Sequence, residues 1–129
     1  MATVLVVDDN TTMVEMLSTA LTILGHSPLG AYSGEQALDI VASQKPDVLL
    51  LDLTMPGMDG YETLRRVRAM PQGEDLPVLI LSAVSEAGLE EKIAMAGGNA
   101  CLSKPIEMKT LAHAIALHLK DNGHKKAPT

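Results

Sequence analysis

The sequence predicts an α/β fold, with a five-stranded parallel sheet covered by helices on both faces. Short apolar runs alternate five times with segments whose apolar residues recur at helical spacing. The run from Val48 to Leu51 is apolar throughout, as in a strand buried on both faces. Repeated strand–helix–strand units join parallel strands by right-handed crossovers, which place helices on the two faces of the sheet.

Length and composition fit one aliphatic domain. We expect this domain to cover residues 1–121, followed over residues 122–129 by a polar tail or the start of a linker. The hydrophobic share is 47%, and the chain has no Trp and no Phe. The core must therefore be built from aliphatic side chains, since these are the main apolar groups that the chain offers.

Charge, cysteine content and hydropathy exclude several function classes. The formal charge of −6 argues against direct nucleic-acid binding, which needs clustered Lys and Arg. Cys101 is the single cysteine, so an internal disulfide is impossible and a reducing compartment is expected. No apolar segment is long enough to span a bilayer, and the N-terminus lacks a signal-peptide pattern. We therefore expect a cytoplasmic protein that does not insert into a membrane.

The first half of the chain contains two predicted strands and two helices. The β-branched run Thr3–Val7 predicts the first strand. The helix that follows has apolar residues from Met13 onwards and is expected to stop at Gly25. A weak strand is expected from Leu29 to Tyr32. Ser33 then caps a second helix, with a glutamine three residues later, as in a capping box.

The second half begins with the central strand that ends at Asp52 and continues with further alternating elements. Each has an apolar run or an apolar stripe, and its ends are marked by Gly, Pro or polar residues. In order, we expect a helix with Tyr61, Leu64, Val67 and Arg68 at helical intervals, a polar loop Pro71–Asp75, a strand Pro77–Leu81, a helix Glu86–Ala96, a strand Ala100–Ser103, and a helix from Met108 that ends at Asn122–Gly123.

Polar side chains follow four of the five predicted strands, namely Asp8 and Asp9, then Asp52, Ser82 and Lys104. Taken singly, each has a simpler explanation, because Asp and Ser are common helix caps and a Lys is usually solvated. The carboxyl ends of parallel strands meet at one edge of a sheet, where ligands bind. We therefore expect the five side chains to converge.

Three converging carboxylates repel one another unless a cation lies among them. Mg²⁺ suits this role, because it takes oxygen ligands from one or two carboxylates, from water and from phosphate. A nearby Lys and hydroxyl would bind the remaining oxygens of a phosphoryl group. Since an Asp carboxylate can act as a nucleophile in phosphoryl transfer, the pattern predicts an aspartate that accepts a phosphoryl group.

Because of these residues, the chain resembles the receiver domain of a two-component response regulator, of the single-domain kind found among chemotaxis regulators. The resemblance covers residues 3 to 120 and depends on the order and spacing of four motifs: Val6–Asn10, Leu50–Gly60, Leu81–Ala83 and Ser103–Pro105. It implies a flavodoxin-like sheet with strand order 2-1-3-4-5.

The resemblance also implies a metal site around the phosphoacceptor. Asp52 is the expected phosphoacceptor and one of the groups around Mg²⁺. Asp9 is expected to bind Mg²⁺ directly, Asp8 mainly through water, and Thr54 through its main-chain carbonyl.

The two remaining side chains are expected to contact the phosphoryl group. Ser82 stands where the family has a Thr or Ser that moves toward this group. Lys104 is expected to contact a phosphoryl oxygen, and its peptide bond to Pro105 is expected to be cis. Cys101 departs from the family, which usually has an aromatic residue at this position, and we expect it to be a passive buried side chain.

The implied function is phosphorelay signalling rather than enzymatic turnover, although such domains assist their own phosphorylation and dephosphorylation. The implied partners are a histidine kinase or a histidine phosphotransfer protein, and a downstream protein target or output domain. The main alternative is a Mg²⁺-dependent phosphohydrolase of the haloacid dehalogenase kind. That family has a second Asp two residues after the nucleophile, where this chain has Thr54.

Two further alternatives are less favoured. A nucleotide-binding domain needs a glycine-rich phosphate loop, but the turn from Asp8 to Thr12 is acidic and contains no glycine. A receiver-like scaffold that takes no phosphate would not need the full set of acids, hydroxyl and Lys.

Overall fold

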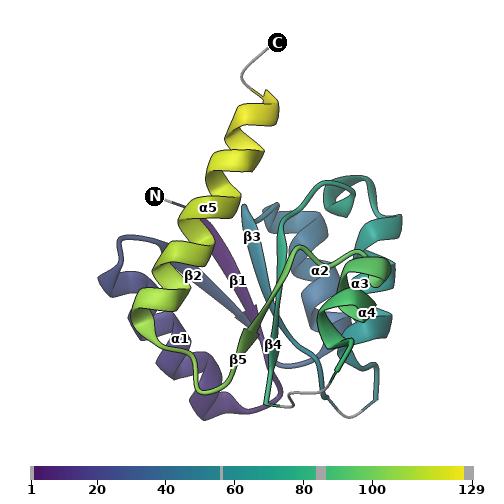
Figure 1. Cartoon of the computed structure of the whole chain (residues 1–129), viewed down its shortest axis with the longest axis horizontal. Coiled ribbons are helices and arrows are strands. Elements are labelled where there is room, and N and C mark those ends of the chain that lie inside the picture. Colours follow the sequence, from purple (N-terminus) through teal and green to yellow (C-terminus); the bar gives the residue numbers. More distant parts are fainter. Residues whose placement is uncertain (1, 56, 84–86, 127–129) are drawn as a thin grey trace.

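The computed structural model describes residues 2–55, 57–83 and 87–126, and it has the predicted five-stranded α/β fold (Figure 1). Strands and helices alternate along the whole chain. In order, the elements are β1 (Thr3–Val7), α1 (Thr11–Ile23), β2 (Ser27–Ala31), α2 (Gly34–Gln44), β3 (Val48–Asp52), α3 (Gly60–Ala69), the 3-10 turn η1 (Pro71–Gly73), β4 (Val78–Ser82), α4 (Leu89–Ala96), β5 (Ala100–Ser103) and α5 (Met108–Lys126).

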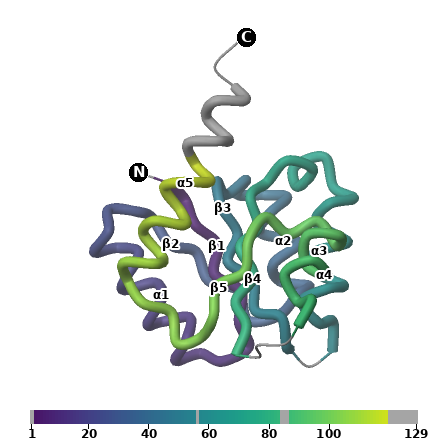
Figure 2. The backbone as a smooth tube through the Cα atoms, in the orientation of Figure 1, coloured from purple at the N-terminus to yellow at the C-terminus, as the bar shows by residue number. Residues whose placement is uncertain are grey.

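The strand order is β2-β1-β3-β4-β5, and all neighbouring pairs are parallel, as the sequence resemblance implies. Helices α1 and α5 cover one face of the sheet, and α2, α3 and α4 cover the other (Figures 1 and 2). Strands β2 and β3 pair with opposite edges of β1, so the chain reverses its direction of winding between them. This arrangement is the topological switch point at which doubly wound sheets bind ligands.

Aliphatic side chains fill the core on both faces of the sheet. The central strands β3 and β4 are buried along their whole length, which explains their continuous apolar runs. Alternate residues of a strand point to opposite faces, so Leu49 and Leu51 pack under α2 and α3, whereas Leu50 packs with α1 and α5. Burial of each such leucine contributes about 1.5–3 kcal/mol.

Several predicted element boundaries are wrong. The strand expected at Pro77–Leu81 lies one residue later, at Val78–Ser82, and larger differences occur at β2 and α5. The second strand was expected at Leu29–Tyr32 but lies at Ser27–Ala31, because an edge strand accepts Pro28, whose missing N–H breaks no ladder bond on its open side. The last helix was expected to end at Asn122–Gly123 but continues to Lys126. Asn and Gly lower helix propensity by only about 1 kcal/mol each and remove no backbone donor, so they do not force a stop.

The other helix boundaries follow local capping chemistry. Asn10, Ser33 and Asp59 each accept a hydrogen bond from the backbone N–H three residues later, at the starts of α1, α2 and α3. Gln36 makes a variant of the expected capping box, because its Oε1 accepts from the N–H of Tyr32, at 2.7 Å, rather than from that of Ser33.

Some predicted features lie outside the described residues. Glu86, the expected start of the fourth helix, is one of them, and so is Pro56. Residues 87 and 88, also expected to be helical, form a turn, and α4 begins at Leu89. Within the described part of the chain, no helix is long and apolar enough to cross a membrane.

Candidate functional site

Four strands end at one edge of the sheet and bring the predicted site residues together. Asp52 is the last residue of β3, and Asp8 follows the last residue of β1; the strand register pairs Val7 with Leu51. Asp8 and Asp52 are therefore level with each other on adjacent strands. Both are almost fully buried, with 1% and 5% of their surface exposed. Buried carboxylates need partners, because an unpaired buried charge is costly.

Lys104 supplies that partner for both carboxylates. Its Nζ lies 3.1 Å from Asp8 Oδ2 and 3.0 Å from Asp52 Oδ1. The residue follows β5, which is separated from β3 by β4, so only a long side chain can reach the two acids from this position. The peptide bond from Lys104 to Pro105 is cis, as the resemblance implies.

Asp8 and Asp9 have different environments, although they are neighbours in the chain. Asp8 uses both oxygens, because its Oδ1 also accepts a hydrogen bond from the N–H of Asn10 at 3.0 Å. Asp9 is exposed. The side chain that caps α1 is that of Asn10, which accepts from Met13 N–H, so helix capping does not account for either aspartate.

Asp8, Asp9 and Asp52 form one acidic cluster at the sheet edge. Each can offer one oxygen such that the three oxygens lie within 4.8 Å of one another. This donor set consists of carboxylate oxygens alone, which is the ligand chemistry of a hard divalent cation such as Mg²⁺. Two buried acids, one exposed acid and one Lys leave the cluster with an excess of negative charge that such a cation would balance.

Burial and the neighbouring charges shift the pKa values of Asp52 and Lys104. Burial is the main cause that raises the pKa of Asp52, and the Asp8 carboxylate raises it further, against the lowering effects of Lys104 and of a main-chain hydrogen bond from Thr54. Burial lowers the pKa of Lys104, but its hydrogen bonds to the two aspartates outweigh this effect and raise it overall. The lysine is therefore firmly cationic.

Ser82 is the last residue of β4 and is 3% exposed. The register pairs Asp52 with Leu81, so Ser82 lies one step further along the neighbouring strand. Its carbonyl oxygen accepts from the N–H of Lys104 at 2.8 Å. This bond links the ends of β4 and β5 beside the acidic cluster.

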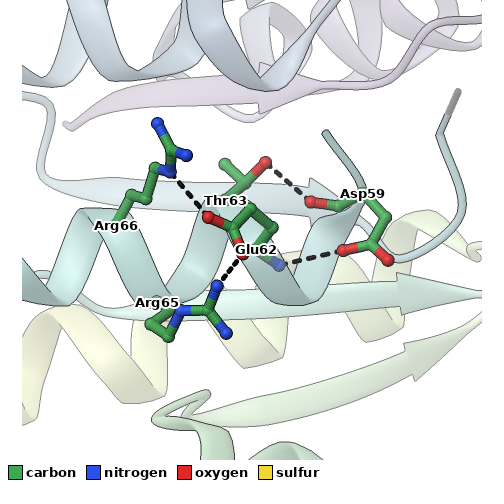
Figure 3. Close-up of polar contacts among 5 residues, drawn as sticks. All are labelled: Asp59, Glu62, Thr63, Arg65 and Arg66. Atoms are coloured by element: carbon green, nitrogen blue, oxygen red, sulfur yellow. Dashed lines mark hydrogen bonds and ion pairs between the residues drawn. The ribbon is translucent and has the colours of Figure 1, made fainter. Parts of the chain in front are cut away.

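The connection after Asp52 is fixed by the first turn of α3. Asp59 Oδ1 accepts from the N–H of Glu62 at 2.9 Å, and the main-chain carbonyl of Asp59 accepts from Thr63 Oγ1 at 2.8 Å (Figure 3). On the outer side, the Glu62 carboxylate pairs with Arg65 and Arg66 (Figure 3). The start of α3 therefore holds the end of the loop that leaves the acidic cluster.

Cys101 is the second residue of β5 and does not lie at the strand end beside the acidic cluster. It pairs in register with Ile80 and packs at the edge of the core cluster that contains Ile93. Burial, assisted by the Glu90 carboxylate, raises the pKa of the Cys101 thiol. The side chain therefore stays a neutral thiol near pH 7, as expected for a small packed residue.

Sequence reasoning missed the structural role of Arg68. Its guanidinium contacts the main chain of residues 5, 8 and 29 positions away, so no local motif could identify its partners. A signal was present nonetheless, because Arg68 falls on the helical spacing of the apolar residues Leu64 and Val67. An arginine on an apolar stripe needs hydrogen-bond partners inside the fold.

Comparison with known proteins identifies relatives over most of the chain. The sequence profile of the response regulator receiver domain matches residues 4–116. Response regulator MprA of Mycobacterium avium is 42% identical over 113 residues, which cover 84% of this chain and 46% of that protein. The chain therefore spans about half the length of these curated relatives.

Solved structures agree with this match. Chemotaxis protein CheY4 of Vibrio cholerae superposes with a TM-score of 0.85 at 30% identity, covering 90% of this chain and 97% of the other. The receiver domain of sensor histidine kinase PA1611 from Pseudomonas aeruginosa also gives a TM-score of 0.85, at 28% identity, covering 92% of this chain and 98% of the other. That protein was solved with a magnesium ion coordinated in its active site cleft.

Proposed function

The chain belongs to the receiver-domain family of two-component response regulators and functions in phosphorelay signalling, and on this premise we propose that Asp52 is its phosphoacceptor. The observation that carries the proposal is the position of Asp52: a buried carboxylate at the end of the central strand, bonded to Lys104 and grouped with Asp8 and Asp9. In this setting Asp52 shares the Lys104 cation with Asp8 and lies in the same acidic cluster as Asp9.

The proposed reaction transfers a phosphoryl group from a phosphohistidine of a histidine kinase or a histidine phosphotransfer protein. An Asp52 carboxylate oxygen attacks phosphorus, an O–P bond forms, and the P–N bond of the donor breaks, leaving the electron pair on the imidazole nitrogen. Lys104 remains cationic and binds a phosphoryl oxygen. The Ser82 hydroxyl donates to another oxygen, so the phosphoryl group gains two protein contacts.

The residues present fit a Mg²⁺ ion, which this family binds at such a cluster. We place Asp8, Asp9 and Asp52 around it, with the main-chain carbonyl of Thr54 as a further ligand. When bound, Mg²⁺ supplies positive charge to the transferring phosphoryl group. The protein contributes the fixed orientation of its acids, because two of them are held by hydrogen bonds within the fold.

The family consists of signalling phosphoacceptor domains rather than enzymes with a separate substrate. We propose that this chain assists its own phosphorylation and dephosphorylation through the residues of the acidic cluster, Ser82 and Lys104. The phosphohydrolase alternative is not favoured, because the family match is to receiver domains and Thr54 stands at the position of the second Asp.

Response regulators of this family interact with histidine kinases and with output effectors. We infer that this chain follows the same pattern in the cytoplasm, with a downstream protein target or an output domain that reads its surface. Phosphorylation can shift the surface only by interacting differently with two conformations of the domain.

The test is labelling with acetyl phosphate in the presence of Mg²⁺, followed by peptide mapping. We expect label on Asp52 alone, and none on this peptide in Asp52→Asn.

Lys104→Ala should still take label but should populate the switched conformation poorly, because the phosphoryl group loses a charged partner. Undiminished Mg²⁺-dependent labelling of Asp52→Asn would show that the phosphoacceptor lies elsewhere.

A further inference from the structure

Helix α4 is held very differently at its two ends, and Arg68 of α3 makes the difference. Its guanidinium has five N–H donors, and five hydrogen bonds occupy them. Nε and Nη2 both donate to the carbonyl of Gly97, at 3.0 and 2.6 Å, and Gly97 is the C-cap residue of α4. A cation at this end also complements the partial negative charge of the helix C-terminus.

The remaining donors of Arg68 connect α4 to the base of the sheet. Nη1 donates to the carbonyls of Gly73 and Leu76, which precede β4. Nη2 also donates to Asn99 Oδ1 at 2.9 Å, and the same oxygen accepts from the N–H of Val78 at 2.7 Å. One side chain therefore joins the end of α4 to the start of β4.

The backbone after α4 is built around this contact. Gly97 has φ +106°, a left-handed conformation that favours glycine. A Cβ at Gly97 would lie 3.2 Å from Arg68 Cγ, so the arginine stem also needs the glycine. Hydrogen bonds from Gly97 N–H to Ala94 and from Gly98 N–H to Ile93 complete a tight end to the helix.

The N-terminal end of α4 has no capping side chain and no arginine anchor in the described structure. Its cap residue is Gly88, which has no side chain that could accept a hydrogen bond, whereas Asn10, Ser33 and Asp59 cap α1, α2 and α3. Leu89 and Ile93 are the buried side chains of the helix. The exposed Lys92 lies over the ring of Tyr61, 5.2 Å from its centre, which adds a weak contact to α3.

We propose that Arg68 is a positioning residue of the switch, which fixes the C-terminal end of α4 so that phosphorylation of Asp52 displaces the N-terminal end of this helix while the C-terminal end stays in place. The proposal rests on the proposed function of Asp52. It extends that function by naming the pivot about which the partner surface changes. Ser82 ends β4 and α4 is the next helix in the chain, so a change at Ser82 reaches the Leu89 end of the helix before it reaches the Gly97 end.

The experiment uses the methyl groups that α4 offers along its length, at Leu89, Ile93, Ala94, Met95 and Ala96. NMR shifts of these methyls and of the Ser82, Gly97, Gly98 and Lys104 amides are recorded with Mg²⁺, before and after addition of beryllofluoride. In the wild type we expect changes at Leu89 and almost none from Ala96 to Gly98. In Arg68→Gln we expect the changes to extend through Gly98.

A matched control is Arg66→Gln, which lies on the same helix but pairs with Glu62 at the surface. Its pattern along α4 should equal that of the wild type. Without beryllofluoride, Arg68→Gln should speed hydrogen exchange of the Gly97 and Gly98 amides about tenfold, whereas the control should change it less than about twofold. If Arg68→Gln does not fold, Asn99→Ala removes one acceptor of the same anchor and should extend the changes to Ala96.

The outcomes separate the two proposals. If beryllofluoride leaves the Ser82 and Lys104 signals unchanged, the proposed function fails, and the pivot fails with it. If these signals change but the wild-type response is uniform along α4, the pivot alone is wrong. The same conclusion follows if the Arg68 and Asn99 variants respond as the Arg66 control does.

Discussion

At the scale of single residues, the raised pKa of Asp52 makes the stability of the metal-free protein depend on pH. Burial is the main cause of the shift. A folded state that holds a proton more tightly than the unfolded chain loses stability as the pH rises from the unfolded pKa to the folded one. Asp52→Asn removes this loss. We expect the variant to be more stable than the wild type by about 1 kcal/mol at about pH 8, and the gain to shrink as the pH falls.

The measurement is urea unfolding in EDTA at several pH values between about 8 and 4. Asp39→Asn, an exposed acid on α2, is the control and should show no such gain. A gain for Asp52→Asn that grows toward acid pH would have the opposite sign and would contradict the assigned cause.

Lys45 carries backbone strain that a single change can relieve. It ends α2 with φ +49°, and it is the only residue other than glycine with a positive φ among the described residues. The left-handed conformation costs an L-residue about 1–2 kcal/mol, part of which glycine loses again through its greater freedom in the unfolded chain. We expect Lys45→Gly to raise the free energy of unfolding by about 0.5–1 kcal/mol.

The control for this variant is the preceding residue. Gln44 is the last residue of α2 and has no left-handed conformation, so Gln44→Gly should lower the free energy of unfolding, by up to about 1 kcal/mol. Both are read from urea midpoints. Equal effects of the two substitutions would show that the conformation of Lys45 is not strained.

Single residues also show how far sequence reasoning reaches. Asp8, Asp52 and Lys104 could be predicted as one site, because each follows a strand and parallel strands end at one edge. The different environments of Asp8 and Asp9 could not be predicted from residue type. The partners of Arg68 could not be predicted either, because they are backbone carbonyls brought together by folding.

At the scale of the elements, the cap of α3 controls how the loop after β3 is held. Asp59 accepts a hydrogen bond from Glu62 N–H at the first turn (Figure 3). Asp59→Ala leaves this donor without a partner and should lower the free energy of unfolding by about 1 kcal/mol. Asp59→Ser keeps a capping oxygen and should recover most of the loss. Thermal unfolding of the two variants measures the effect, and an equal loss in both would show that the cap contributes nothing.

The elements divide into those with strong and weak sequence signals. The strands β1, β3 and β4 are buried, so their apolar runs predicted them well. The edge strand β2 begins two residues and ends one residue earlier than predicted, because an exposed edge tolerates polar residues and proline. The end of α5 was wrong because glycine weakens a helix without stopping it. The strand order needed the family resemblance, since periodicity does not say which strands are neighbours.

At the scale of the whole molecule, Mg²⁺ binding should raise the free energy of unfolding. A ligand that binds only the folded state adds about 2.7 kcal/mol to the free energy of unfolding at one hundred times its dissociation constant. Under the proposed function we expect this gain for the wild type. We expect most of it to be lost in Asp9→Ala, since one ligand of the cluster is removed. Urea unfolding with Mg²⁺ and with EDTA gives both values.

The control is Glu15→Ala, which removes an exposed acid of α1 outside the cluster and should keep the full gain. A gain in Asp9→Ala equal to that of the wild type would mean that Mg²⁺ acts through general charge screening or through another site.

The contact between Tyr61 and Lys92 has a practical consequence for the study of this molecule in solution. The chain has no Trp and only two Tyr, so its near-ultraviolet absorption and emission come from tyrosine alone. Tyr32 follows the edge strand β2, whereas the centre of the Tyr61 ring of α3 lies 5.2 Å from Nζ of Lys92 in α4. In a Tyr32→Phe background, Tyr61 therefore becomes an intrinsic optical probe, and its emission reports on the spacing between α3 and α4 without any added dye.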